Sequence, residues 1–189
     1  RVAPTESVWL TEEGLERQPE EVRSFLLETS ILERLTGPLC DEVTGRSDGQ
    51  TMLERLERAN LFLVPLDDER RWYRFHHLFR DLLRARLEHT RSDEVPDLHR
   101  RAVTWCERHG LIDQAIGHAA ASGDADRAVR LVEEHVNETL FRSENVTLRR
   151  WLSLLPEDVV RSSPALCLAH GLTEIHVGHV HRNELLAAQ

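Results

Sequence analysis

Two adjacent histidines, His76 and His77, stand where the sequence predicts that a strand ends and a helix begins. An imidazole at such a junction can donate a hydrogen bond to a phosphate oxygen, and the first backbone N–H groups of the helix and its dipole add to the attraction. The residues alone favour a plainer role, that of a half-buried histidine closing the turn, because a histidine pair carries little information. His76 is therefore the candidate anion-binding residue, with the structural role kept as the alternative.

A second histidine group, His176, His179 and His181, has the spacing HxxHxH. The first two can share a helix face, but His181 points elsewhere. The nearest carboxylates, those of Glu174 and Glu184, do not complete a zinc set. We expect a solvated cluster and no metal. A metal-dependent hydrolase built on these histidines would require stoichiometric zinc.

No arrangement of residues in the sequence predicts catalysis. The acidic run from Asp67 to Glu69 could bind a cation, but Arg70 and Arg71 follow it and offset its charge, which favours a solvated hairpin tip. No GxSxG sequence occurs, and no serine or cysteine stands in a glycine-tight turn. All 24 basic residues are arginine, which excludes Schiff-base chemistry and a P-loop lysine from this chain. We expect the chain itself to be no enzyme.

The composition is that of a globular protein. The 189 residues include 33 acidic and 24 basic side chains, a formal charge of −9, which argues against a general binder of nucleic acid or anionic membrane. No apolar run approaches the roughly 20 residues of a membrane-spanning helix. The cysteines form no CxxC pair and are expected in the core. These cysteines are Cys40, Cys106 and Cys167. We expect a cytoplasmic protein that has no membrane partner and is cut from a longer chain.

Three short helices are predicted first. One runs from Pro19 to Leu32, and a second begins at Thr36 and ends at Gly45, which can take the left-handed cap conformation. Ser47 or Asp48 can cap the third. Its apolar stripe is Met52, Leu53, Leu56 and Ala59.

A β-hairpin and a fourth helix are predicted next. Leu61–Val64 is a compact apolar run ending at Pro65, and Trp72–Phe75 is aromatic and extended. Helical spacing returns near His76. The order of three helices, a hairpin and a helix is that of a winged-helix domain, which we place at 19–91, with 1–18 as a linker helix or a remnant of a preceding module. The fourth helix has the apolar residues Leu78, Phe79, Leu82, Leu83 and Leu87.

The rest of the chain, 92–189, is predicted to form antiparallel helical hairpins. A polar stretch, Thr90–Pro96, marks the boundary. A polar-polar-Ala-aliphatic unit at Asp113–Ile116 recurs at Asp126–Val129, which indicates stacked hairpins of the tetratricopeptide-like kind at the start of a longer solenoid. Ser143 is expected to open a helix that Pro156 stops. The fold class is therefore mainly α.

The third helix of a winged-helix domain can read DNA, but this one is a poor candidate. Its outward residues include two acids and two arginines, whereas a helix that faces phosphates should be positive. A packing or interdomain role is the preferred interpretation. The outward residues are Gln50, Thr51, Glu54, Arg55, Glu57 and Arg58.

Three segments, Leu35–Gly45, Arg58–Asp67 and Tyr73–Leu83, closely resemble the large ATP-dependent LuxR-family transcriptional regulators of bacteria, the MalT-like group of signal-transducing (STAND) ATPases. The resemblance runs from about Leu15 to Pro164, and the likeness thins after Leu168. It implies a P-loop ATPase module before this segment, a helical-repeat sensor, and a C-terminal helix-turn-helix that binds promoters. This chain would hold the winged helix and the first repeats.

The same segment is similar to the end of the nucleotide-binding module of plant immune receptors, where a Met-His-Asp motif places a histidine against the β-phosphate of ADP. By that similarity His76 matches the histidine, and His77 stands in the place of the aspartate. The resemblance implies a nucleotide-sensing role for His76.

The resemblance implies a non-catalytic regulatory segment that couples nucleotide state to inducer sensing and multimerisation. Its partners would be its own P-loop module, a small-molecule or protein inducer on the repeats, and promoter DNA only through a further domain. The full-length protein would bind ATP and ADP and would hydrolyse ATP. This segment alone would bind neither nucleotide. The alternative is a freestanding tetratricopeptide-like adaptor that binds a peptide and no nucleotide. An upstream P-loop in the gene would distinguish the two.

Overall fold

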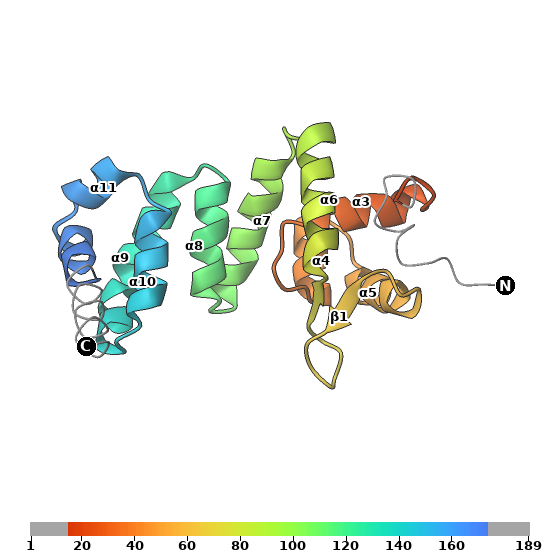
Figure 1. The fold of residues 1–189 in the computed structure, drawn as a ribbon, viewed down its shortest axis with the longest axis horizontal. Helices are drawn as coiled ribbons and strands as arrows, with labels where there is room; N and C mark the ends of the chain where they lie inside the picture. The colour runs from red at the N-terminus through yellow and green to blue at the C-terminus, as the bar shows by residue number, and fades with distance from the viewer. Residues whose placement is uncertain (1–14, 174–189) are drawn as a thin grey trace, which may run out of the picture. The chain divides into compact units, whose positions relative to one another are not determined.

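The computed structural model describes residues 15–173, which fold into two compact units that divide between Trp105 and Cys106. The first unit contains a winged helix and the second contains antiparallel helices, as the sequence predicts. The limits expected for independent modules, 19–91 and 92–189, stay a prediction. Helix α7 contributes residues to both units. Figure 1 shows the elements in chain order: α3 Glu20–Thr29, α4 Gly37–Thr44, α5 Gly49–Arg58, β1 Leu63–Pro65, β2 Tyr73–Phe75, α6 His77–Thr90, α7 Val95–Arg108, α8 Ile112–Ala121, α9 Ala125–Phe141, α10 Asn145–Ser153 and α11 Glu157–Ser162.

The winged-helix core forms where α3 packs against α4 and α6, and α4 packs against α5. Strands β1 and β2 pair antiparallel with Leu63 opposite Phe75. Leu35 adds a bridge on the other side of β2, where its N–H and C=O each form a 2.8 Å hydrogen bond with Tyr73. Tyr73 is fully buried, and its hydroxyl donates to Glu57 of α5 at 3.4 Å. The hairpin is thereby tied to the segment between α3 and α4 and to helix α5.

Two glycines allow α4 and α5 to approach closely. A Cβ on Gly37 would lie 2.7 Å from the Cβ of Gln50, and one on Gly49 would lie 2.6 Å from the carbonyl oxygen of Gly37. The N–H of Gly49 donates to the Asp41 carboxylate at 2.7 Å. Asp48 occupies the cap position expected from the sequence but makes no side-chain cap bond; both of its carboxylate oxygens accept from Arg46 at 2.7 Å.

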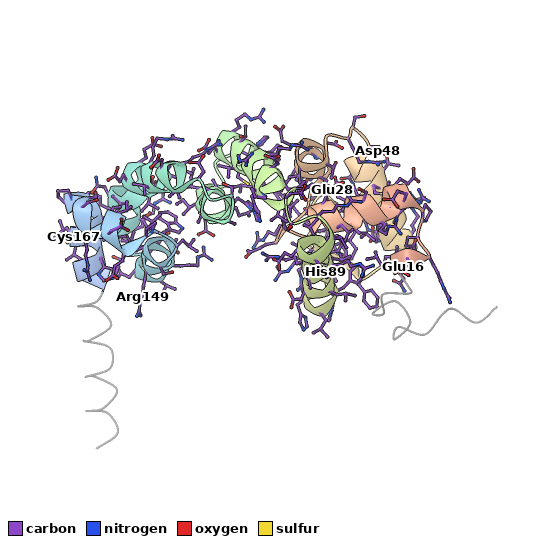
Figure 2. The ribbon with its side chains drawn as sticks, turned by 90° about the horizontal axis from the view of Figure 1, so that it is seen from above. Glu16, Glu28, Asp48, His89, Arg149 and Cys167 are labelled. Atoms are coloured by element: carbon purple, nitrogen blue, oxygen red, sulfur yellow. The ribbon has the colours of Figure 1, made fainter. Side chains whose placement is uncertain are left out.

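Arg91, which follows α6, ties that helix to α3. Its guanidinium donates to the hydroxyl of Ser24 at 2.9 Å and to the carboxylates of Glu28 and Glu20 at 3.4 Å each. Figure 2 labels Glu28 on α3 and His89 in the last turn of α6. Arg91 thus holds the C-terminal end of α6 against α3, at the opposite end of the helix from His76.

The predicted glycine turns are confirmed. Gly45 ends α4 with φ of 72°, and Gly110 follows α7 with φ of 68°. Three details of the sequence interpretation are wrong. Cys167, expected in the core with Cys40 and Cys106, is exposed. Leu78 is 55% exposed, because the buried face of α6 repeats every four residues from Phe79. Ser143 has φ of 58° and lies in the turn before α10, whose cap residue is Glu144.

The second unit is built from α8, α9 and α10, which contact one another as neighbouring helices (Figure 1). Ala115 and Ala128, the small residues of the sequence repeat, are fully buried and permit close packing of α8 on α9. Trp151 of α10 is buried, and its indole N–H donates to Asp113 of α8 at 2.7 Å. A further helical stretch covers 164–173 at the end of the described residues.

An arginine–carboxylate pair fixes the start of α9 in this unit. Arg127 donates to both carboxylate oxygens of Glu107, at 3.1 and 2.7 Å, and Arg130 donates to the same group at 3.3 Å. The hydrogen bond from Arg127 lowers the pKa of Glu107, and the charge of Arg130 adds to this effect.

His99 of α7 predicts a pH-dependent stability. Its side chain is 4% exposed, and burial, together with the charge of Arg84, lowers its pKa from 6.5 to about 4. Between these values the unfolded chain binds a proton that the folded chain does not. Stability is therefore full above pH 6.5 and falls by about 3 kcal/mol as the pH drops to 4.

Urea denaturation at pH 7 and pH 4.5 tests this expectation. His99→Gln removes the titrating imidazole, so the variant should lose less stability than the parent chain between the two pH values. Equal losses in the two proteins would show that His99 does not cause the pH dependence.

Candidate functional site

His76 lies between β2 and α6 and occupies the N-cap position of the helix. Its backbone is extended, with φ of −58° and ψ of 136°, and its side chain makes no cap hydrogen bond. The side chain is half-buried. The predicted strand-to-helix junction is confirmed, and it places His76 directly before the first N–H groups of a 14-residue helix. Those N–H groups and the helix dipole favour an anion at this end of α6.

The backbone of His76 is held on both sides. Its N–H donates to the carbonyl oxygen of Phe62 at 2.7 Å, and its own carbonyl oxygen accepts from the N–H of Arg80 at 2.9 Å. Phe62 and His76 face each other immediately beyond the last hairpin pair, Leu63 and Phe75. The hairpin register therefore sets the position of His76 at the start of the helix.

Two rings, those of His77 and Phe62, lie near the imidazole of His76. The ring centroids of His76 and His77 are 4.3 Å apart with a tilt of 34°, and the Phe62 ring lies 6.5 Å from that of His76. The Phe62 ring also packs on Phe79 at 5.2 Å. His77 is exposed, so the pair predicted from the sequence consists of one half-buried and one solvent-facing ring.

Arg80 adds a positive charge one turn into α6. Its Nε is shielded from solvent and has no hydrogen-bond partner within residues 15–173, and it lies 3.8 Å from the carboxylate of Asp81. A buried guanidinium N–H without an acceptor is unfavourable, and an anionic acceptor would relieve it. The single histidine pair gave no reason to select Arg80, although the i, i+4 spacing from His76 is a signal that helix geometry provides.

Phe62 was also missed by the sequence interpretation, which placed Leu61–Val64 in one strand. The structure starts β1 at Leu63, because Asn60 and Phe62 have φ of 59° and 51° and cannot continue a ladder. The asparagine before the apolar run was the available signal, since asparagine tolerates this conformation better than other residues.

The outward face of α5 is occupied by ion pairs within the first unit. Arg55 pairs with Glu21 at 2.8 Å, and Arg58 pairs with Glu54 at 3.5 Å. Gln50 donates to the carbonyl oxygen of Arg70 at 3.2 Å. Acidic partners thus offset the charges of Arg55 and Arg58, and the packing role preferred from the sequence stays a prediction.

The hairpin tip is organised by its own acidic residue. The Asp67 carboxylate accepts from the N–H of Arg71 at 2.8 Å and from that of Trp72 at 3.2 Å.

Over residues 15–173, no cluster of three or more His, Cys, Asp or Glu side chains could hold a metal ion. His176, His179 and His181 lie outside the described residues. None of the helices within the same range is long and apolar enough to cross a bilayer.

Comparison with known proteins identifies the first unit. The model of the MalT winged helix domain matches residues 11–95. The serine/threonine-protein kinase PknK of Mycobacterium tuberculosis (strain ATCC 25618 / H37Rv) is 40% identical over 161 residues, which are 85% of this chain and 14% of the kinase. The HTH-type transcriptional regulator MalT of Cronobacter sakazakii is 35% identical over 162 residues, and that of Klebsiella pneumoniae (strain 342) is 36% identical over 162.

These alignments cover 86% of this chain and 18% of each MalT protein, so the chain spans less than a fifth of the length of these relatives. The resemblance read from Leu35–Gly45, Arg58–Asp67 and Tyr73–Leu83 is confirmed, since all three segments fall within the matched range. The chain therefore carries a MalT winged helix domain over residues 11–95 and is a MalT-like segment.

Proposed function

We propose that this chain is the regulatory segment of a bacterial, ATP-dependent transcriptional activator of the MalT type, in which the winged helix couples nucleotide state to inducer sensing and multimerisation. The observation that carries the proposal is the placement of His76 at the N-cap of α6 without a cap bond of its own, inside a domain that matches the MalT winged helix. The segment contributes a switch, and the chemistry of ATP hydrolysis belongs to a P-loop module elsewhere in the protein.

The residues at this site suit the phosphate end of a nucleotide. His76 brings a ring N–H donor, the first turn of α6 brings backbone N–H groups, and Arg80 brings a shielded Nε that lacks an acceptor. Charge-assisted hydrogen bonds to phosphate are stronger than neutral ones. These donors would therefore stabilise the protein with an anion bound relative to the protein without one. A bound nucleotide supplies the negative charge. The chain supplies donors held in place by the hairpin and by α6.

A switch of this kind requires that the nucleotide prefer one conformation. ADP clamped by His76 would favour a closed protein, and an inducer on the helical unit would favour an open form that binds ATP and multimerises. A ligand that bound both forms equally would shift nothing. Promoter DNA would bind through a further domain and not through α5, whose arginines are paired with acids.

His76→Ala in the full-length protein tests the proposal. The variant should release ADP at least about tenfold faster and raise basal transcription, because one hydrogen bond to a charged group is worth roughly 1.5–3 kcal/mol. The measurement is the release rate of a fluorescent ADP analogue.

His89→Ala is the matched control, since His89 is an exposed histidine in the last turn of the same helix and should leave ADP release unchanged. An ADP release rate that is the same for His76→Ala and the parent protein would contradict the nucleotide-sensing role.

A second candidate function follows from the likeness to PknK, which is 40% identical over 85% of this chain. The same segment would then regulate a serine/threonine kinase module, with the nucleotide switch unchanged and the output different. The gene decides between the two candidates: a kinase domain in the same reading frame supports this one, and a helix-turn-helix domain supports the transcriptional activator. A reading frame that carries no P-loop would instead support the freestanding adaptor.

A further inference from the structure

The backbone at Phe62 is in an unusual conformation for its residue type. Phe62 has φ of 51°, in the left-handed region that side chains with a Cβ avoid, and Asn60 has φ of 59° two residues earlier. Asparagine tolerates this region, but an aromatic residue gains nothing from it locally. Glycine would make the same turn without strain. The Phe62 side chain therefore needs an explanation other than the turn itself.

The left-handed conformation of Phe62 allows this residue to make two contacts with His76 at the start of α6. It directs the Phe62 carbonyl oxygen to the N–H of His76 at 2.7 Å, and it places the ring 6.5 Å from the His76 ring, at an interplanar angle of 59°. The same ring packs on Phe79 at 5.2 Å, and Phe79 meets Phe75 edge-on at 5.9 Å. Phe62 is thus supported by Phe79, which in turn packs on Phe75.

His76 depends on such support because its side chain makes no cap hydrogen bond. The aromatic groups found against its ring are Phe62 and the exposed His77. The ring of His77 faces solvent, whereas that of Phe62 is half-buried and anchored on Phe79. Strained residues persist where the surrounding structure holds them, and they gather at functional sites.

We propose that Phe62 is a positioning residue for His76: its left-handed backbone fixes the His76 N–H, and its ring fixes the orientation of the imidazole. The functional meaning of this placement rests on the nucleotide-sensing role proposed for His76, whereas the placement itself does not. Phe62 acts through His76, and no contact between Phe62 and a ligand is required.

The backbone and ring contributions can be separated in this chain by NMR. In Phe62→Gly, glycine keeps the left-handed turn without strain, so the His76 N–H should keep its protection from hydrogen exchange. The ring is lost, so the ring-current shift of the His76 imidazole protons should disappear, and the His76 χ1 couplings should average. Phe62→Tyr retains an aromatic ring and should restore both signals. Asn60→Gly, which changes the neighbouring left-handed residue, should leave the His76 side chain as in the parent chain.

Unchanged imidazole shifts and χ1 couplings of His76 in Phe62→Gly would overturn the proposal. If Phe62→Gly does not fold, Phe62→Leu replaces it, because leucine fills part of the volume without a ring. Loss of the ring-current shift with averaged couplings in Phe62→Leu supports the proposal, and fixed χ1 couplings there overturn it.

ADP release from the full-length protein separates this inference from the proposed function. Phe62→Gly should accelerate ADP release in the same direction as His76→Ala. The acceleration should be at most about tenfold, because the loss of one aromatic pair changes a rate or equilibrium constant by no more than about that factor. Altered His76 signals with unchanged ADP release would support the placement and contradict the nucleotide role of His76. Unaltered His76 signals, with release accelerated only by His76→Ala, would support the nucleotide role and overturn the positioning by Phe62.

Discussion

Gly37→Ala should destabilise the winged-helix unit by about 3 kcal/mol, the upper part of the range for overpacked sites. The added Cβ would lie 2.7 Å from the Cβ of Gln50 and 2.9 and 3.0 Å from its backbone N and Cα. None of these atoms is the far end of a flexible side chain, so α4 and α5 would have to separate. The separation would also weaken the 2.7 Å hydrogen bond between Gly49 and Asp41. Urea denaturation monitored by circular dichroism measures the loss.

Gly117→Ala is the matched control, since Gly117 lies inside α8 and a Cβ there meets nothing within 4 Å. That substitution should stabilise the helical unit by about 1 kcal/mol, because alanine is the better helix former. Opposite signs for the two substitutions separate steric exclusion from helix propensity. A Gly37→Ala protein as stable as the parent chain would show that the two helices are free to move apart.

The order of elements could be predicted from the sequence because it depends on local signals. The change from helical spacing to a compact apolar run and then an aromatic extended run marked the hairpin, and Gly45 and Gly110 marked two helix ends through their need for a positive φ. These signals act over a few residues, so no knowledge of distant contacts was required.

Features that depend on contacts between distant residues could not be predicted. Asp41 accepts from Gly49, eight residues away, and Leu35 joins the hairpin by bonding to Tyr73. Both follow from how close the elements come after folding. The exposure of Leu78 is of the same kind, since an apolar residue in the first turn of α6 lies beside the buried stripe and not in it.

The candidate site was predicted in part. The junction residue His76 follows from the strand-to-helix change, and the structure confirms the junction. The residues around it required the hairpin register, which places Phe62 opposite His76 and starts β1 at Leu63. The shielded Nε of Arg80 is equally invisible in the sequence, because shielding is a property of the packed helix.

Trp105→Ala should destabilise the first unit by about 3–5 kcal/mol, the range for truncating a buried tryptophan. Trp105 lies on α7, is 7% exposed, and meets the ring of Trp72 edge-on at a centroid distance of 6.4 Å. Arg101, one turn earlier, donates to the carbonyl oxygen of Val43 at 2.9 Å. The truncation leaves a cavity beside the hairpin that the Arg101 bond does not fill.

The urea midpoint of the first unit, followed by the amide NMR signals of the winged helix, tests this expectation. Leu78→Ala is the control in the same unit, because Leu78 is 55% exposed and its truncation should change stability by less than about 0.5 kcal/mol. Trp105→Phe should lie between the two, since phenylalanine keeps part of the apolar volume and one edge for Trp72. A midpoint for Trp105→Ala equal to that of Leu78→Ala would show that Trp105 does not pack α7 onto the winged helix, and the α7 residues before Cys106 would then be held by Arg101 and their other contacts alone.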